Sequence, residues 1–166
     1  MDITLTKTLG VGLATLALAG IVVVLASGAS AQDPTTRTLT FKALDKGSTF
    51  THVRNTKPKS ERSNSTGDGI VFTNPLADAS GNVVGKQYAE CITTKGARNF
   101  LRSTLTCTAV MDLRDGTLTM QANSKPGVPT TTGAVTGGTG AYANARGVFA
   151  AKDSSAGGDT TITLAD

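Results

Sequence analysis

Short segments in which apolar and polar residues alternate are the feature of this sequence that most restricts its fold. The clearest runs from residue 101 to residue 113, where apolar side chains fill most odd positions and Thr or Arg several even ones. A period of two residues is typical of a β-strand with one buried face. Beyond residue 31, no stretch has the 3.6-residue apolar period of a long helix. The sequence therefore predicts an all-β domain.

Turn signals such as Asp78-Ala79-Ser80-Gly81-Asn82 and Asp115-Gly116 separate the alternating segments. The segments with strand character lie at residues 36–44, 48–54, 70–72, 83–94, 101–113, 118–120, 132–136, 145–152 and 159–165. We expect seven or eight short antiparallel strands from them, arranged as a closed barrel or a sandwich. Closure is attractive for a small chain because it leaves no exposed strand edge.

The N-terminal segment has the pattern of an export signal. An apolar run from Leu9 to Leu25 follows a single basic residue, Lys7, and the segment ends in the small residues Ala29-Ser30-Ala31. We predict a signal peptide at residues 1–31 and one mature domain at residues 32–166. The alternative is an uncleaved membrane anchor, because a run of about 17 residues is near the lower limit for a membrane span. The predicted location is secreted or extracytoplasmic.

Charge and histidine content argue against several classes of function. The net charge is +4, and the basic residues are scattered, are not interleaved with aromatic residues and are accompanied by no Trp. This composition does not favour nucleic-acid binding. His52 is the only histidine and the chain has two cysteines, so we expect no metal site and no cofactor.

The two cysteines, Cys91 and Cys107, are predicted to form a disulfide, as an even pair usually does in an oxidising compartment. A hairpin centred near residue 99 would place them opposite each other, on the face that carries Leu105 and Ala109. A loop of this length would contribute about 3 kcal/mol by a chain-entropy estimate.

Three short motifs have an ordinary interpretation beside a functional one. Gly138-Thr139-Gly140-Ala141-Tyr142-Ala143 matches a dinucleotide-binding fingerprint, but no helix pattern follows it, so we interpret it as a glycine-rich corner. His52 is a candidate general base or an ordinary polar residue near a loop. Asn64-Ser65-Thr66 is a glycosylation sequon, which matters only if a eukaryote secretes the chain.

The segment Gly67-Asp68-Gly69-Ile70-Val71-Phe72-Thr73-Asn74-Pro75-Leu76 resembles plant allene oxide cyclases, as do Val84-Gly85, Cys91 and Val135-Thr136-Gly137-Gly138-Thr139-Gly140. The last stretch, with Tyr142 and Ala145-Arg146-Gly147, also resembles plant dirigent proteins. Bacterial cyclases that close spirotetronate rings are similar too. The resemblance covers residues 67–165 and implies an eight-stranded antiparallel β-barrel with a mainly apolar cavity.

The resemblance to allene oxide cyclases implies that Asn74 and Cys91 line the pocket and that the Asn holds a water that anchors an epoxide oxygen. The acidic residue that the family has on its first strand falls near Thr40, and its proline after Gly-Ser falls on Thr49. Compared with dirigent proteins, Thr73 and Asn74 replace paired aspartates, and Ala141 replaces a third. Their arginine falls near Thr131.

From the residues and the resemblance together, we expect a barrel that encloses a small apolar molecule and guides its cyclisation, isomerisation or coupling, mainly by positioning. The expected ligand-binding residues are Asn74, Tyr88 and Tyr142, with Cys91 added only if it is not bridged. The alternative is a non-catalytic ligand carrier or surface interaction protein. A homo-oligomer is an expectation carried by the family alone, and contact with a membrane is expected only if the N-terminal segment stays uncleaved.

Overall fold

The computed structural model describes residues 36–55, 63–154 and 157–165 of the chain, so the predicted signal peptide lies outside the described residues. In the described part, no helix is long and apolar enough to cross a membrane. The described elements are the strands β1 (Thr36–Ala43), β2 (Thr49–Val53), β3 (Gly69–Ala77), β4 (Val83–Lys95), β5 (Thr104–Leu113), β6 (Gly116–Ser124), β7 (Thr130–Gly138), β8 (Arg146–Ser154) and β9 (Gly157–Ala165), and two 3-10 helices, η1 (Phe100–Arg102) and η2 (Gly140–Tyr142).

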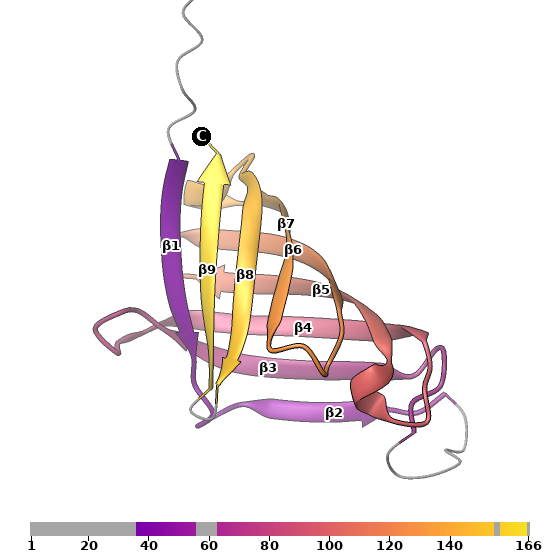
Figure 1. Ribbon diagram of the computed structural model, residues 1–166. Coiled ribbons are helices and arrows are strands. Elements are labelled where there is room, and N and C mark those ends of the chain that lie inside the picture. Colours follow the sequence, from indigo (N-terminus) through magenta and orange to yellow (C-terminus); the bar gives the residue numbers. More distant parts are fainter. Residues whose placement is uncertain (1–35, 56–62, 155–156, 166) are drawn as a thin grey trace, which may run out of the picture. The chain divides into compact units, whose positions relative to one another are not determined.

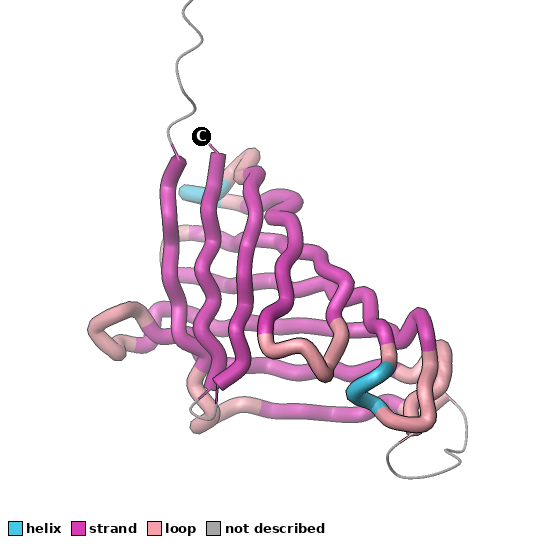
Figure 2. The backbone as a smooth tube through the Cα atoms, viewed as in Figure 1, coloured by secondary structure: helices cyan, strands magenta, loops and turns pink. Residues whose placement is uncertain are grey.

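The strands form a closed antiparallel barrel (Figures 1 and 2). From β3 to β9 each strand pairs with the next, β9 pairs with β1, and β1 pairs with β3 through Lys42 and Ala43. This ring contains eight strands, and β2 pairs only with β3, between Thr73 and Gly69. The prediction of an all-β, eight-stranded antiparallel barrel is confirmed, and the alternative of a sandwich is excluded.

The barrel closes at a seam where β3 changes partner from β2 to β1. Leu44 N donates a hydrogen bond to Pro75 O, at 2.9 Å. In an antiparallel strand the N–H and C=O of one residue point to the same neighbouring strand. The C=O of Pro75 points to the seam, so its nitrogen, which has no hydrogen to donate, also points there, and the pairing with β4 loses no hydrogen bond. The sequence predicted a strand only at residues 70–72. The strand continues to Ala77 because Pro75 lies between the residues of β3 that pair with β2 and those that pair with β1, where no partner strand needs its N–H.

One end of the barrel, which we call the filled end, is closed by a packed core. Leu76, Met111, Leu118 and Ile162 are completely buried there, and Tyr142 of η2 lies among the same cluster. Gly140, which begins η2, has φ +59°, a conformation that glycine adopts without strain. The interpretation of this segment as a glycine-rich corner is therefore confirmed.

The alternation expected from residue 101 begins later than predicted. Leu101 lies in η1 and is 55% exposed, and Oδ1 of Asn99 accepts a hydrogen bond from its backbone N–H at 3.0 Å. This cap ends the preceding connection and delays β5 until Thr104. From Leu105 to Leu113 the odd positions face inward, as the period of two indicates.

Candidate functional site

The opposite end of the barrel encloses a cavity of about 560 Å³, within the range of small-molecule pockets. The inward positions of the strands form its wall, in which Ala, Phe and Thr are the most frequent residues. Its opening, which we call the mouth, is bordered by residues from the β1–β2 turn, from η1 and from the β6–β7 connection, represented by Ser48, Leu101 and Pro126. The cavity exists because inward positions such as Ala89, Ala109 and Ala151 are small, whereas the filled end has Leu and Met.

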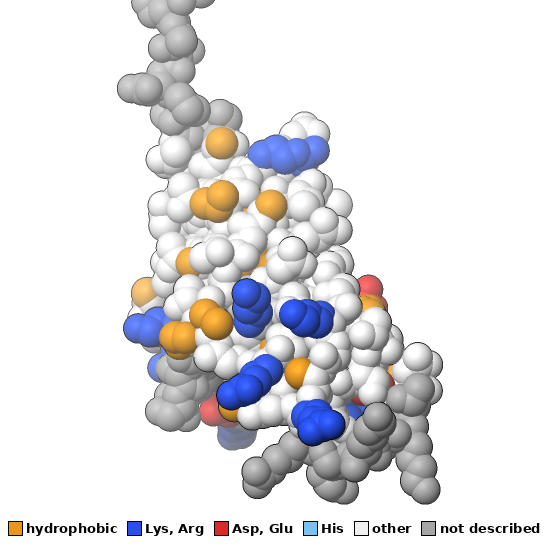
Figure 3. Space-filling view, turned by 45° about the vertical axis from the view of Figure 1, so that its right-hand side comes forward, with side chains coloured by type: hydrophobic (Ala, Val, Ile, Leu, Met, Phe, Trp, Pro, Cys, Tyr) orange, Lys and Arg blue, Asp and Glu red, His pale blue; other side chains and the backbone are white. Residues whose placement is uncertain are grey.

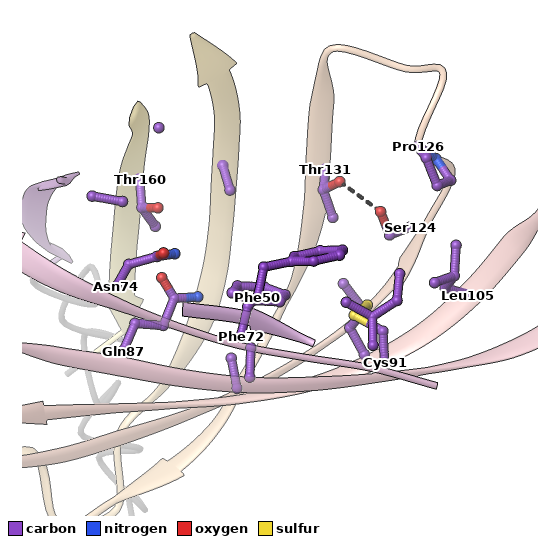
Figure 4. Close-up of a pocket in the computed structure, with 18 of the residues that line it drawn as sticks. Phe50, Phe72, Asn74, Gln87, Cys91, Leu105, Ser124, Pro126, Thr131 and Thr160 are labelled. Atoms are coloured by element: carbon purple, nitrogen blue, oxygen red, sulfur yellow. Dashed lines mark hydrogen bonds between the residues drawn. A yellow bond between two sulfur atoms is a disulfide. The ribbon is translucent and has the colours of Figure 1, made fainter. Parts of the chain in front are cut away.

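The uncharged polar groups of the cavity wall are two side-chain amides and several hydroxyls, among them those of Ser124 and Thr131, which hydrogen-bond to each other. Asn74 of β3 and Gln87 of β4 are directly opposite each other in the strand register, and both side chains point into the cavity (Figure 4). Neither side chain forms a hydrogen bond with any described residue, so both retain N–H donors and a carbonyl acceptor for a ligand. Thr160 of β9 adds a hydroxyl to the wall, at the same end of the cavity in the view of Figure 4.

Ionisable groups are scarce in this wall. The described lining residues include no Asp, Glu or His, and Lys152, near the mouth, is the only charged one. Within the described residues, no three His, Cys, Asp or Glu side chains lie together in a way that could hold a metal ion. The arrangement can therefore hold a mainly apolar molecule and donate hydrogen bonds to one of its oxygen atoms. It offers no carboxylate for proton transfer.

A disulfide between Cys91 and Cys107 forms part of the cavity wall. The two residues are direct cross-strand partners in β4 and β5, with their Cα atoms 4.0 Å apart. The predicted disulfide and the predicted hairpin register are confirmed. Because the bridge consumes the thiol of Cys91, its expected role as a free pocket cysteine does not apply. The sulfur atoms instead present an apolar surface beside Ile70 and Leu105.

Comparison with known proteins gives the family. A family model described as "Allene oxide cyclase barrel like domain" matches residues 48–162, which is more than half of the chain. The chain belongs to the allene oxide cyclase barrel-like family. No curated protein matches the sequence. The resemblance inferred from the motifs is thus confirmed at the level of the family.

Solved structures support the barrel fold of this allene oxide cyclase-like chain. A pyocyanin demethylase is similar with a TM-score of 0.62 and 23% identity, over 78% of this chain and 99% of that one. A pterocarpan synthase dirigent protein has a TM-score of 0.57 and 21% identity, over 80% and 84%. A nonspecific heme-binding cyclase of neoabyssomicin biosynthesis has a TM-score of 0.60 and 13% identity, over 81% and 68%. At these identities the likeness concerns the fold alone.

Of the three residues expected to bind the ligand whether or not Cys91 is bridged, the structure of this family member places only Asn74 on the cavity. Tyr88 is 45% exposed on the outer face of β4, with Lys86 Nζ 5.6 Å from its ring centre. Positions 87, 89 and 91 of β4 face inward, so position 88 must face outward. Tyr142 is 8% exposed within the core of the filled end, with Arg37 over its ring. Neither tyrosine lines the cavity.

Sequence reasoning missed Gln87 and Thr160. A partial signal for Gln87 was present, because the turn at residues 78–82 pairs β3 with β4 near this position; a β-bulge at Leu76 and Ala77 then shifts the partner of Asn74 from Lys86 to Gln87. No comparable signal marks Thr160. It faces the cavity because β9 pairs with β1 and β8, and this arrangement is a property of the closed barrel and not of the local sequence.

His52 lies outside the cavity lining, in a structural network. Its Nε2 donates a hydrogen bond to Asn64 Oδ1 at 3.1 Å, and Asn64 Nδ2 donates to Thr93 Oγ1 at 2.5 Å. Asn64 is 3% exposed. In the folded protein the nitrogen of the sequon is buried and bonded, so it is not accessible for glycan attachment. His52 fits the interpretation of an ordinary polar residue.

Proposed function

We propose that this member of the allene oxide cyclase barrel-like family is an exported protein that encloses a small, mainly apolar molecule and guides its cyclisation, isomerisation or coupling. The observation that carries the proposal is the pair of unbonded amides, Asn74 and Gln87, in an otherwise largely apolar cavity. Both amides face the cavity and bond to no protein group, so their N–H donors and carbonyl acceptors are available to an oxygen atom of a ligand.

The mechanism follows from what this wall offers. The cavity confines a flexible molecule to few conformations and brings its reacting atoms together, which lowers the entropic part of the barrier. The amide N–H groups of Asn74 and Gln87 donate to a carbonyl, ether or epoxide oxygen and stabilise negative charge that develops on it. Exclusion of water by the apolar wall protects a reactive intermediate from hydrolysis.

Export is supported by two features of the chain. The first 31 residues have the pattern of a signal peptide, and Cys91 is bridged to Cys107, as is common in oxidising compartments. A cytoplasmic protein would keep such a pair reduced in most organisms.

A non-catalytic carrier is the second candidate function. The observation that favours it is the absence of any Asp, Glu or His among the described lining residues. A carrier needs the shape and the amide pair, but it needs no group that transfers a proton. Both candidates predict the same binding site, and turnover separates them.

The test is a binding and turnover assay with unsaturated fatty-acid epoxides, phenolic radicals and polyketides. We expect Asn74→Leu and Gln87→Leu each to weaken binding or turnover about tenfold, the loss of one hydrogen bond to a buried oxygen. Gln121→Leu is the matched control, because Gln121 is exposed on β6 and does not line the cavity. Altered product stereochemistry supports the cyclase, and tight binding without turnover supports the carrier. Wild-type behaviour of both cavity variants would remove the amides from the site.

A further inference from the structure

The rim of the mouth carries exposed, large apolar side chains. Phe50 of β2 is 67% exposed and Leu101 of η1 is 55% exposed, and both also line the cavity. Val128, in the β6–β7 connection, is 47% exposed. This connection lies against η1, since a Cβ on Gly127 would be only 2.6 Å from Leu101 O. Apolar side chains gathered in this way mark a contact surface.

Basic residues surround these apolar side chains. The rim connections at residues 44–48, 96–103 and 125–129, together with the end of β8, contain five exposed basic residues: Lys46, Arg98, Arg102, Lys125 and Lys152. The acidic residues in and next to these segments are Asp45, Asp153 and Asp159. Basic residues therefore outnumber acidic residues at the rim by five to three. Figure 3 shows basic side chains over the lower half of the molecule in that view, with apolar side chains among them.

We propose that the mouth of the barrel docks on the surface of an anionic phospholipid bilayer. Exposed apolar side chains enter the boundary between headgroups and acyl chains, and basic side chains beside them contact anionic headgroups. A protein partner fits this rim less well, because lysine is depleted in protein–protein interfaces and three of the five basic residues are Lys. This docking is independent of residues 1–31.

The docked orientation also places the cavity opening against the lipid. An apolar ligand then passes between bilayer and cavity without crossing water, which would otherwise oppose its transfer in proportion to its apolar area. This consequence rests on the proposed function. The docking itself does not rest on the proposed function, because it requires only the exposed side chains of Phe50, Leu101 and the five basic residues.

Vesicle binding of the full chain, without added ligand, tests the proposal. We expect binding to phosphatidylcholine vesicles that contain phosphatidylglycerol, weakened by salt because the headgroup contacts are electrostatic. Lys125→Gln and Lys152→Gln should each weaken it about fivefold. The double variant Phe50→Ser/Leu101→Ser should weaken vesicle binding about tenfold or more. Circular dichroism and the thermal midpoint confirm that each variant is folded.

Matched controls lie at the filled end. Val83 is 57% exposed and Arg114 is exposed there, so Val83→Ser and Arg114→Gln should keep wild-type affinity. Every variant has the same residues 1–31, so any contribution of that segment is common to all. Equal binding to vesicles of phosphatidylcholine alone would overturn the proposal. So would mouth variants that bind like the wild type, or control variants that lose as much. Because no ligand is present, such a failure leaves the proposed function standing.

Discussion

Asp68 is a buried carboxylate that holds the connection between β2 and β3 in place. It is 1% exposed, and its two oxygens accept hydrogen bonds from the backbone N–H of Asn55 and of Ser65, each at 2.9 Å. Arg54 lies 3.6 Å away. Burial alone raises the pKa of this carboxyl, but the N–H donors of Ser65 and Asn55 and the charge of Arg54 outweigh it. The net result is a pKa below the ordinary 3.8.

This lowered pKa predicts acid sensitivity. Between the folded-state pKa and 3.8 the unfolded chain binds more protons than the folded one. The contribution of Asp68 is therefore complete above that window and is lost as the pH falls through the folded-state pKa. We expect Asp68→Asn to cost about 1–2 kcal/mol near neutral pH and to lessen the dependence of stability on pH in the acid range.

Urea denaturation at a series of pH values measures both effects of this substitution. Asp112→Asn, on the exposed face of β5, serves as the control and should follow the wild type. An acid profile of Asp68→Asn that matches the wild type would show that Asp68 does not carry the dependence.

At the scale of residues, the candidate marked by a motif lies on the cavity, whereas a candidate taken from residue type alone does not. Asn74 followed from the motif that ends in Pro75-Leu76, and it lines the cavity. Tyr88 is a candidate only because of its polar-tipped ring. Cys91 faces inward, and positions three apart on a strand face opposite sides, so the predicted disulfide already implied that Tyr88 points outward.

At the scale of elements, the turn between β1 and β2 controls the seam of the barrel. Gly47 in this turn has φ +87°, and a Cβ there would lie 3.2 Å from Cγ of Pro75. The hydroxyl of Ser48 donates to Leu44 O at 2.5 Å, which fixes the turn from the other side. The turn therefore positions Ser48 and Thr49 on the cavity wall through its contact with the proline of β3.

Substitution of Gly47 tests this coupling. Gly47→Ala should destabilise the barrel by about 1–3 kcal/mol, from the unfavourable φ and the contact with Pro75. Gly81→Ala is the matched variant, because Gly81 has φ +83° but no atom within 4 Å of an added Cβ. Urea denaturation of both separates the two effects. Equal losses would mean that the contact with Pro75 contributes nothing.

Strand prediction from alternation worked because a half-buried strand must alternate, and it failed where another interaction decided the local structure. The register of β4 and β5 was predictable from one hairpin centre. The extent of β3 was not, since a proline normally ends a central strand and here it faces the seam. The start of β5 depended on the cap that Asn99 forms on η1.

At the scale of the whole domain, stability and binding are assigned to different halves of the barrel. The filled end holds the completely buried Leu76, Met111, Leu118 and Ile162, whereas the other end holds the cavity. The sequence predicted a cavity only through the family resemblance. Alternation shows which side chains face inward, but not whether they meet across the barrel.

Two substitutions examine this division. Leu118→Ala should cost about 2–5 kcal/mol, because the packed surroundings cannot close the space that it leaves. Ala151→Leu places extra carbon atoms in the cavity and not in the packed core, so we expect stability within about 1 kcal/mol of the wild type and a clear loss of ligand binding. Urea denaturation and the binding assay measure the two properties. A large loss of stability in Ala151→Leu would show that the cavity end is also tightly packed.

The small side chains at Ala89, Ala109 and Ala151 have a consequence for the history of such a barrel. Positions that contribute little to folding can mutate without loss of the scaffold, so selection for a new ligand can act on them freely. The bridge between Cys91 and Cys107 extends this freedom, because it holds two adjacent strands together whatever side chains surround it. Exchange of a few wall residues would therefore change which molecules the cavity fits while it leaves the packed filled end intact.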